Sequence, residues 1–229
     1  MSPDISKDPR VLIVEYALKR LEELSKSKSF KLPASKEKTF EAINRMNSVI
    51  KEIKYSYLSP TELSNKKLMK DFTLMANQFW DAISKNLNFD RNDFTHMELK
   101  FIFNILKGLG SRLMLGNESS LDKAIDIIAV KVVSVSKMKD KENLFLCRVG
   151  DGTEIINVIT NLGGIKKGAV LPAAILPPAQ FGPEISTVMF LSGKDLADMH
   201  ENVGERVKNI TNEMLKEANY HILNLIKSK

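Results

Sequence analysis

The side chains that could perform catalysis or bind a metal ion are few and scattered in this sequence. None of the three histidines, His96, His200 and His221, stands at metal-ligand spacing from a second histidine, a cysteine or paired carboxylates. The single cysteine, Cys147, lies in an apolar run without an evident histidine partner and is interpreted as a small core residue. The sequence therefore predicts a protein that is not an enzyme and has neither a metal site nor a cofactor.

Two glycine-rich stretches are interpreted as turns rather than as phosphate-binding loops. Gly150-Asp-Gly152 precedes residues typical of a strand, whereas a phosphate-binding loop leads into a helix. Residues 163–168 lack the Gly-Lys-Ser or Gly-Lys-Thr ending of such a loop. Because an Asp-Gly pair adopts positive φ readily, Asp151-Gly152 predicts a two-residue hairpin turn.

Apolar residues at helical spacing dominate the first half of the chain. Residues of helix-capping type predict helix starts at Asp8, Ser35, Ser59 and Thr95. Four amphipathic helices joined by short polar loops predict an antiparallel helical bundle, which we assign to residues 1–118.

The middle of the chain has the alternating, β-branched pattern of strands. Predicted strands lie at residues 125–136, 143–149, 154–160, 169–176 and 188–191. Short strands at this spacing predict a small antiparallel, OB-fold-like β-barrel, assigned to residues 119–193. The fold class is therefore α+β. Pro172 predicts an edge position or a bulge within its strand.

The last region, residues 194–229, is predicted to form one amphipathic helix. Its apolar residues follow steps of three and four, close to a coiled-coil seam: Leu196, Met199, Val203, Val207, Ile210, Met214, Ala218, His221/Ile222 and Leu225. Such a seam predicts either a homodimer or packing against the bundle of the same chain, and the spacing alone does not choose between them.

Composition indicates where the protein works and where its charge lies. No apolar run approaches the roughly 20 residues of a membrane span, and one cysteine fits a reducing compartment, so we expect a cytoplasmic protein without membrane association. The net charge is +6, and residues 1–120 hold 20 Lys and Arg against 15 Asp and Glu. Residues 121–193 hold only 8 against 7, so a basic site there requires local arrangement.

Several motifs follow one another in the predicted barrel. Asn143-Leu-Phe-Leu-Cys-Arg-Val149 is followed by residues 155–162, then by residues 168–177, Phe181-Gly182 and Ser186-Thr-Val-Met189. Over about 70 residues this order resembles the tRNA-binding OB-fold domain of methionyl-tRNA synthetases, of CsaA-type proteins and of eukaryotic synthetase-complex cofactors. The loop at 137–142 lacks the His-Pro and Ala-Asp pairs of that family, and residues 173–177 lack its Asn and Lys.

The resemblance implies that one barrel face binds tRNA or another structured RNA. Basic side chains would contact phosphates, while amide and hydroxyl groups would contact bases or riboses. The candidate residues are Lys137, Lys139, Lys141, Arg148, Asn157, Asn161, Lys166, Lys167, Gln180 and Ser186. Lysines at residues 26–38 and 66–70 of the helical part could extend the RNA footprint.

Two functions from different classes remain open at this point. The first is a tRNA-binding protein, acting alone or in trans as an accessory to an aminoacyl-tRNA synthetase. The second is a non-enzymatic interaction or scaffold protein whose barrel no longer binds RNA and which oligomerises through its helices. The missing family residues favour the second function, whereas the retained strand order favours the first.

Overall fold

The computed structural model describes residues 4–138, 141 and 143–228. The chain divides into two compact units, which we call the helical unit (residues 1–124 and 222–229) and the barrel unit (residues 125–221). The first boundary thus falls at 124/125 rather than 118/119, and most of the predicted third region belongs to the barrel unit.

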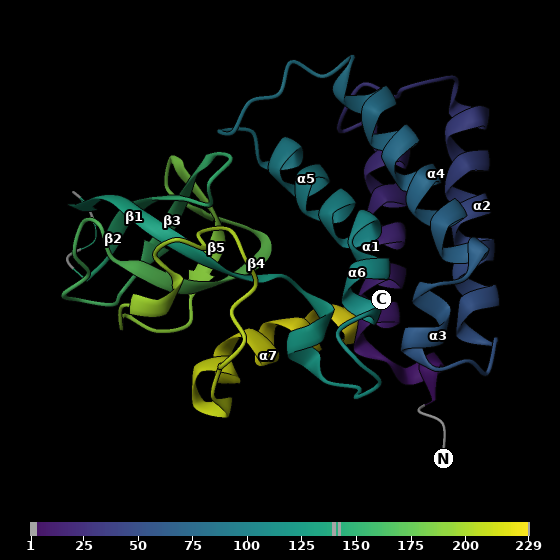
Figure 1. Cartoon of the computed structure of the whole chain (residues 1–229). Coiled ribbons are helices and arrows are strands. Elements are labelled where there is room, and N and C mark those ends of the chain that lie inside the picture. Colours follow the sequence, from purple (N-terminus) through teal and green to yellow (C-terminus); the bar gives the residue numbers. More distant parts are fainter. Residues whose placement is uncertain (1–3, 139–140, 142, 229) are drawn as a thin grey trace. The chain divides into compact units, whose positions relative to one another are not determined.

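The helical unit is a bundle, as the helical periodicity predicts. Its elements are η1 (Ile5–Lys7), α1 (Pro9–Lys26), α2 (Lys36–Lys54), α3 (Pro60–Ser64), α4 (Lys67–Ser84), α5 (Phe94–Lys107), α6 (Leu109–Leu113) and η2 (Leu121–Ala124). α1 packs against α2 and α5, and α4 packs against the same two helices, so the four long helices enclose one apolar core (Figure 1).

The caps explain where these helices begin. The predicted starts at Asp8 and Ser35 are confirmed, since each side chain accepts a backbone N–H of the first turn. The fourth long helix begins after Asp93, not Thr95, because the Asp93 carboxylate already accepts the His96 N–H at 3.0 Å. The predicted third helix is interrupted, because Asn65 Nδ2 donates to the Thr61 carbonyl and α3 ends there.

A buried ion pair closes the helical unit. Asp8 and Arg10 are both fully buried, and Arg10 Nη2 donates to Asp8 Oδ2 at 2.6 Å. Arg10 Nη1 also donates to the carbonyls of Arg112 and Gly116, at 3.1 and 2.7 Å. The first residues of α1 are thereby fixed to the end of α6, where the bundle gives way to the linker.

The barrel unit contains five antiparallel strands: β1 (Ile127–Lys137), β2 (Phe145–Gly150), β3 (Ile155–Thr160), β4 (Val170–Phe181) and β5 (Glu184–Phe190). They form one sheet in the order β3-β2-β1-β4-β5. The two outer strands meet, because the Ile159 N–H donates to Ser186 Oγ at 3.2 Å and Asn157 Nδ2 donates to Glu184 Oε2 at 3.1 Å. The sheet therefore curls into the OB-fold-like barrel that the sequence predicts.

Inward-facing side chains fill the barrel. Its buried core consists of Val130, Val132, Cys147, Val149, Val158, Leu171, Ala173, Val188 and Phe190. Cys147 is one of these residues, in agreement with its interpretation as a core hydrophobe. Burial raises the pKa of the Cys147 thiol, which keeps the thiol neutral and poorly nucleophilic.

Two local predictions for the strands need correction. The turn between β2 and β3 spans residues 151–154 rather than two residues, because Asp151 Oδ1 accepts the N–H groups of Thr153 and Glu154, each at 2.8 Å. Pro172 lies within β4 opposite Ala129 of β1. The Ala129 N–H and C=O groups bond to residues 204–205 instead. The missing N–H of Pro172 therefore leaves no group of Ala129 without a partner.

The segment after β5 is not the continuous helix that was predicted. It contains a short 3-10 turn, η3 (Ala197–Met199), and then runs along β1, where Gly204 N donates to Ala129 O and Val207 N to Ile127 O. The helix proper, α7, spans only Asn212–Lys227. Val207 packs with Ala129 and Val170 under the barrel, and Leu196, Met199 and Val203 cover this cluster.

The apolar residues predicted to form one helical seam over residues 196–225 therefore do not lie on one helix. The first half of this seam closes the barrel of its own chain. The buried residues of α7 are Leu215, Ala218, Ile222 and Ile226, of which only Ala218 and Ile222 belong to the predicted seam. None of the described helices combines the length and the apolar character that crossing a membrane requires.

Gly204 provides a test of how firmly this segment holds the barrel. Its φ is +91°, and a Cβ atom there would overlap the carbonyl oxygen of Asp151. We expect Gly204→Ala to lower the free energy of unfolding by roughly 2 kcal/mol and to speed hydrogen exchange of the Ala129 amide. Gly193→Ala is the matched control, because nothing lies within 4 Å of its added Cβ. Equal exchange in the two variants would contradict the assignment of residues 204–207 to the barrel.

Candidate nucleic-acid interface

A row of polar side chains crosses the outer face of the barrel. Arg148 on β2 is paired with Ser134 on β1 and with Asn157 on β3. Their neighbours Cys147 and Val158 are also paired and point into the core. Since successive side chains of a strand alternate between faces, Arg148 and Asn157 must point outward.

Across β2, β3 and β5 the row presents a cation, then an amide, then a carboxylate. Arg148 is exposed, and among the described residues it has no hydrogen-bond or ion-pair partner. Asn157 donates to Glu184, so its amide is held in place by β5. Strands lie about 4.8 Å apart, so Arg148 and Glu184 stand roughly two strand spacings from each other with Asn157 between them. The guanidinium thus remains available for an external anion.

The loop between β1 and β2 reaches the turn between β4 and β5. The ammonium group of Lys141 lies over the ring of Phe181, 5.6 Å from its centroid, which is within the range of a cation–π interaction. Gln180 Nε2 donates to the Gly182 carbonyl at 3.2 Å and is thereby directed onto the same turn. In OB-folds this loop and this turn flank the ligand-binding face of β2 and β3.

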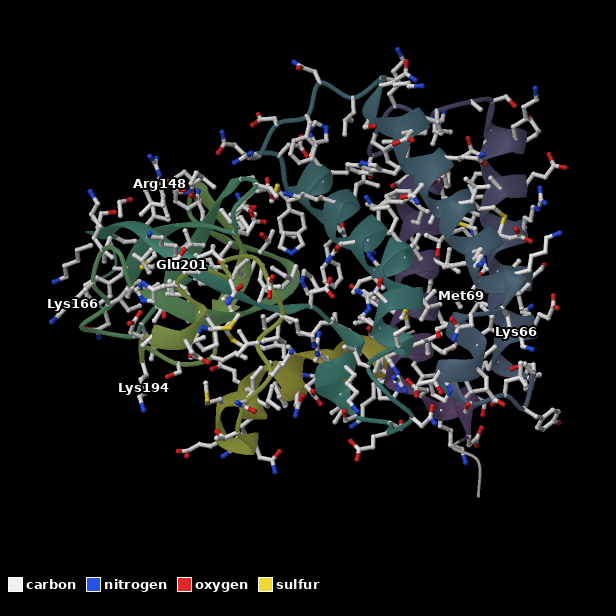
Figure 2. All side chains as sticks on the ribbon, viewed as in Figure 1. Lys66, Met69, Arg148, Lys166, Lys194 and Glu201 are labelled. Atoms are coloured by element: carbon white, nitrogen blue, oxygen red, sulfur yellow. The ribbon has the colours of Figure 1, made fainter. Side chains whose placement is uncertain are left out.

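The other predicted residues lie in different surroundings. Lys166 and Lys167 belong to the turn that joins β3 to β4, where Gly168 N donates to Val132 O on the β4 side of β1. Figure 2 shows Lys166 and Arg148 projecting from separate parts of the barrel. Lys137 and Asn161 are exposed at the strand ends beside Phe145 and Thr160. Lys139 lies outside the described residues.

Ser186 needs correction as a candidate contact for RNA. It is buried, accepts the Ile159 N–H, and donates to the Val188 carbonyl at 3.0 Å. The hydroxyl therefore joins β3 to β5, where a nucleic acid cannot reach it.

Sequence reasoning missed several residues of this face. Ser134 and Glu184 complete the polar row, while Val133 and Ile155, each 42% exposed, lie on either side of Gly150. Strand alternation alone could not place Val133 and Ser134, because the register between β1 and β2 shifts between Val132 and Ser134. Glu184 joins the row only because β5 meets β3, a contact between residues distant in the sequence. Within residues 4–138, 141 and 143–228 no group of three or more His, Cys, Asp or Glu side chains could hold a metal ion.

Comparison with known proteins places the helical part in a family. Residues 1–116 match the family described as "Alpha helical domain". The chain belongs to this family. No curated protein matches the sequence. The family assignment agrees with the helical bundle and says nothing about what the barrel binds.

Ser134 and Ser186 give a paired test of the interface. Ser186→Ala removes hydrogen bonds between β3 and β5, so we expect the free energy of unfolding to fall by about 1–2 kcal/mol. Ser134→Ala makes the same chemical change on the exposed face and should alter stability by less than about 0.5 kcal/mol. Chemical denaturation followed by circular dichroism measures both. Equal stability of the two variants would contradict the structural role of Ser186.

Proposed function

We propose that this protein binds tRNA or another structured RNA through the outer face of β2 and β3. The observation that supports it best is the row Ser134–Arg148–Asn157–Glu184, in which an exposed guanidinium without a partner among the described residues stands beside a fixed amide. Arginine binds phosphates in a bidentate geometry, and amides bond to base edges. A cation for the backbone and an amide for a base are two of the contacts by which proteins recognise RNA.

The charge of the barrel unit supports recognition of a folded RNA rather than indiscriminate binding to polyanions. Residues 125–221 hold 11 Lys and Arg against 12 Asp and Glu, so bulk attraction is weak. A carboxylate at Glu184 also repels a phosphate at that point and accepts hydrogen bonds from base amino groups. The resemblance to the tRNA-binding domains of synthetases and their cofactors extends the proposal to an accessory role, in trans, for an aminoacyl-tRNA synthetase in the cytoplasm.

A second candidate function is a protein-interaction module. It is favoured by Val133 and Ile155, two half-exposed aliphatic side chains that lie next to the polar row. A partner protein would cover them, whereas RNA gains little from aliphatic contacts. The proposed dimerisation through a C-terminal seam no longer supports this candidate, because the first half of that seam closes the barrel.

Charge reversal on the barrel separates the two candidates. Arg148→Glu places a carboxylate at the proposed phosphate contact, so we expect tRNA affinity to fall about ten-fold or more at roughly 50 mM salt and the slope of log affinity against log salt to decrease by about one. Lys166→Glu is the matched control, an exposed cation of the same barrel that lies away from this face. Filter binding or fluorescence anisotropy with total tRNA measures both.

Each outcome of this titration has a clear meaning. If the full chain does not retain tRNA even at about 50 mM salt, where phosphate contacts are strongest, the RNA proposal is wrong. If Arg148→Glu and Lys166→Glu weaken binding equally, RNA binding stands but the β2–β3 face is not its site.

A further inference from the structure

Two tyrosines at the end of α2 are exposed to solvent without an evident structural role. Tyr57 is 89% exposed, the highest value for any large hydrophobic side chain that the structure describes, and Tyr55 is 64% exposed. Neither phenol has a hydrogen-bond partner among the described residues. Large aromatic side chains ordinarily bury most of their surface, so two such rings separated by one residue indicate a binding surface.

The backbone conformation of Tyr57 also supports a role for its ring outside the fold. Its φ is +57°, a conformation that glycine adopts freely and that helix ends normally assign to glycine or asparagine. The turn is fixed by its neighbours, since Ser56 Oγ donates to the Ile53 carbonyl at 2.8 Å and accepts the Leu58 N–H at 3.4 Å. The tyrosine ring therefore contributes nothing to the fold that a glycine would not provide.

Four exposed lysines stand on the helix ends before and after the two tyrosines. Lys51 lies one turn before the end of α2, and Lys66, Lys67 and Lys70 open α4; all four are exposed, and none forms an ion pair among the described residues. α2 ends and α3 begins at the same end of the helical unit (Figure 1), where Figure 2 places Lys66.

One carboxylate close to this turn in the sequence is already engaged by a helix cap. Glu62 accepts the Ser59 N–H and hydroxyl, at 2.9 and 2.6 Å. These hydrogen bonds lower the pKa of Glu62, and the charge of Lys66 lowers it further. Lys66 follows directly on α3, since its N–H donates to the Leu63 carbonyl at 3.0 Å, while Glu62 is engaged by the cap of α3. Glu52 and Asp71 are the other exposed carboxylates of these helix ends.

We propose that Tyr55 and Tyr57, with Lys51, Lys66, Lys67 and Lys70, form a second RNA-binding surface that takes a single-stranded segment. Bases would stack on the phenol rings, and the ammonium groups would contact the phosphates. Tyrosine is common in protein–protein interfaces too, but lysine is depleted in them, so the four lysines favour RNA over a protein partner. The surface belongs to the helical unit and does not depend on the β2–β3 face.

Binding of an oligouridylate about 12 nucleotides long, within the usual site size, tests the surface in the full-length chain. Tyr57→Ala should weaken binding about ten-fold, the equivalent of one lost base stack, whereas Tyr57→Phe keeps the ring and should bind as the parent does. Tyr220→Ala is the matched control, since Tyr220 on α7 is also 64% exposed but has none of these lysines on its helix.

A stability measurement excludes a merely structural role. Tyr57→Gly relieves the strained φ, so its melting temperature should rise while its affinity for the oligouridylate falls. Lys28→Gly, at another non-glycine position with positive φ (+54°), is the control for stability alone and should give a similar thermal gain. A lower melting temperature for Tyr57→Gly would overturn the argument from strain.

Comparison with Arg148→Glu separates this proposal from the one for the barrel. If Arg148→Glu weakens RNA binding and Tyr57→Ala does not, the tyrosine surface is not an RNA site and the barrel proposal stands. If only Tyr57→Ala weakens binding, the tyrosine surface stands and the barrel proposal fails. If the chain binds neither tRNA nor the oligouridylate at low salt, both proposals are wrong.

Discussion

The architecture of the candidate interface depends on the pairing register of β1. This strand pairs with β2 over residues 131–137, with β4 over residues 127–131, and with residues 204–207 at its start. A shift of one residue between β1, β2 and β3 would turn every side chain to the opposite face. Arg148 and Asn157 would then enter the core, and Cys147 and Val158 would face solvent. Burial of the apolar core side chains therefore fixes the register that places the polar row on the outer face.

The same constraint explains why the region after β5 cannot be a helix from its start. The Ala129 N–H and C=O point away from β4 and would be unpaired where β2 has already ended. Residues 204–205 satisfy both groups, and Val207 covers the apolar side chains of Ala129 and Val170. Buried backbone groups require hydrogen-bond partners. Residues 196–210 therefore pair with β1 instead of forming the helix that the spacing of their apolar residues predicts.

Local signals were predictable from the sequence, and pairings between distant residues were not. Asp8 and Ser35 cap their helices through atoms within three residues, and the alternation of β2 and β3 is local too. Asp93 and Thr95 are both good caps, so sequence alone could not choose between them. The approach of Glu184 to Asn157 joins residues far apart in the chain, and the position of Lys166 away from Arg148 follows from barrel closure. Tyr57 carries no local signal, because its positive φ is set by the turn around it.

The two proposed RNA contacts lie on separate units of one chain, which would have a consequence for affinity. Once one unit has bound, the second contact is intramolecular, and its effective concentration depends on the connection between the units rather than on the bulk concentration. Each site could then be weak alone, with one arginine on the barrel and two tyrosines on the helical unit, and the combined affinity for a long RNA would still exceed either. A near-neutral barrel would be compatible with RNA binding on these terms. The helical unit, which holds the whole positive surplus, would supply the electrostatic attraction, and the polar row would supply discrimination.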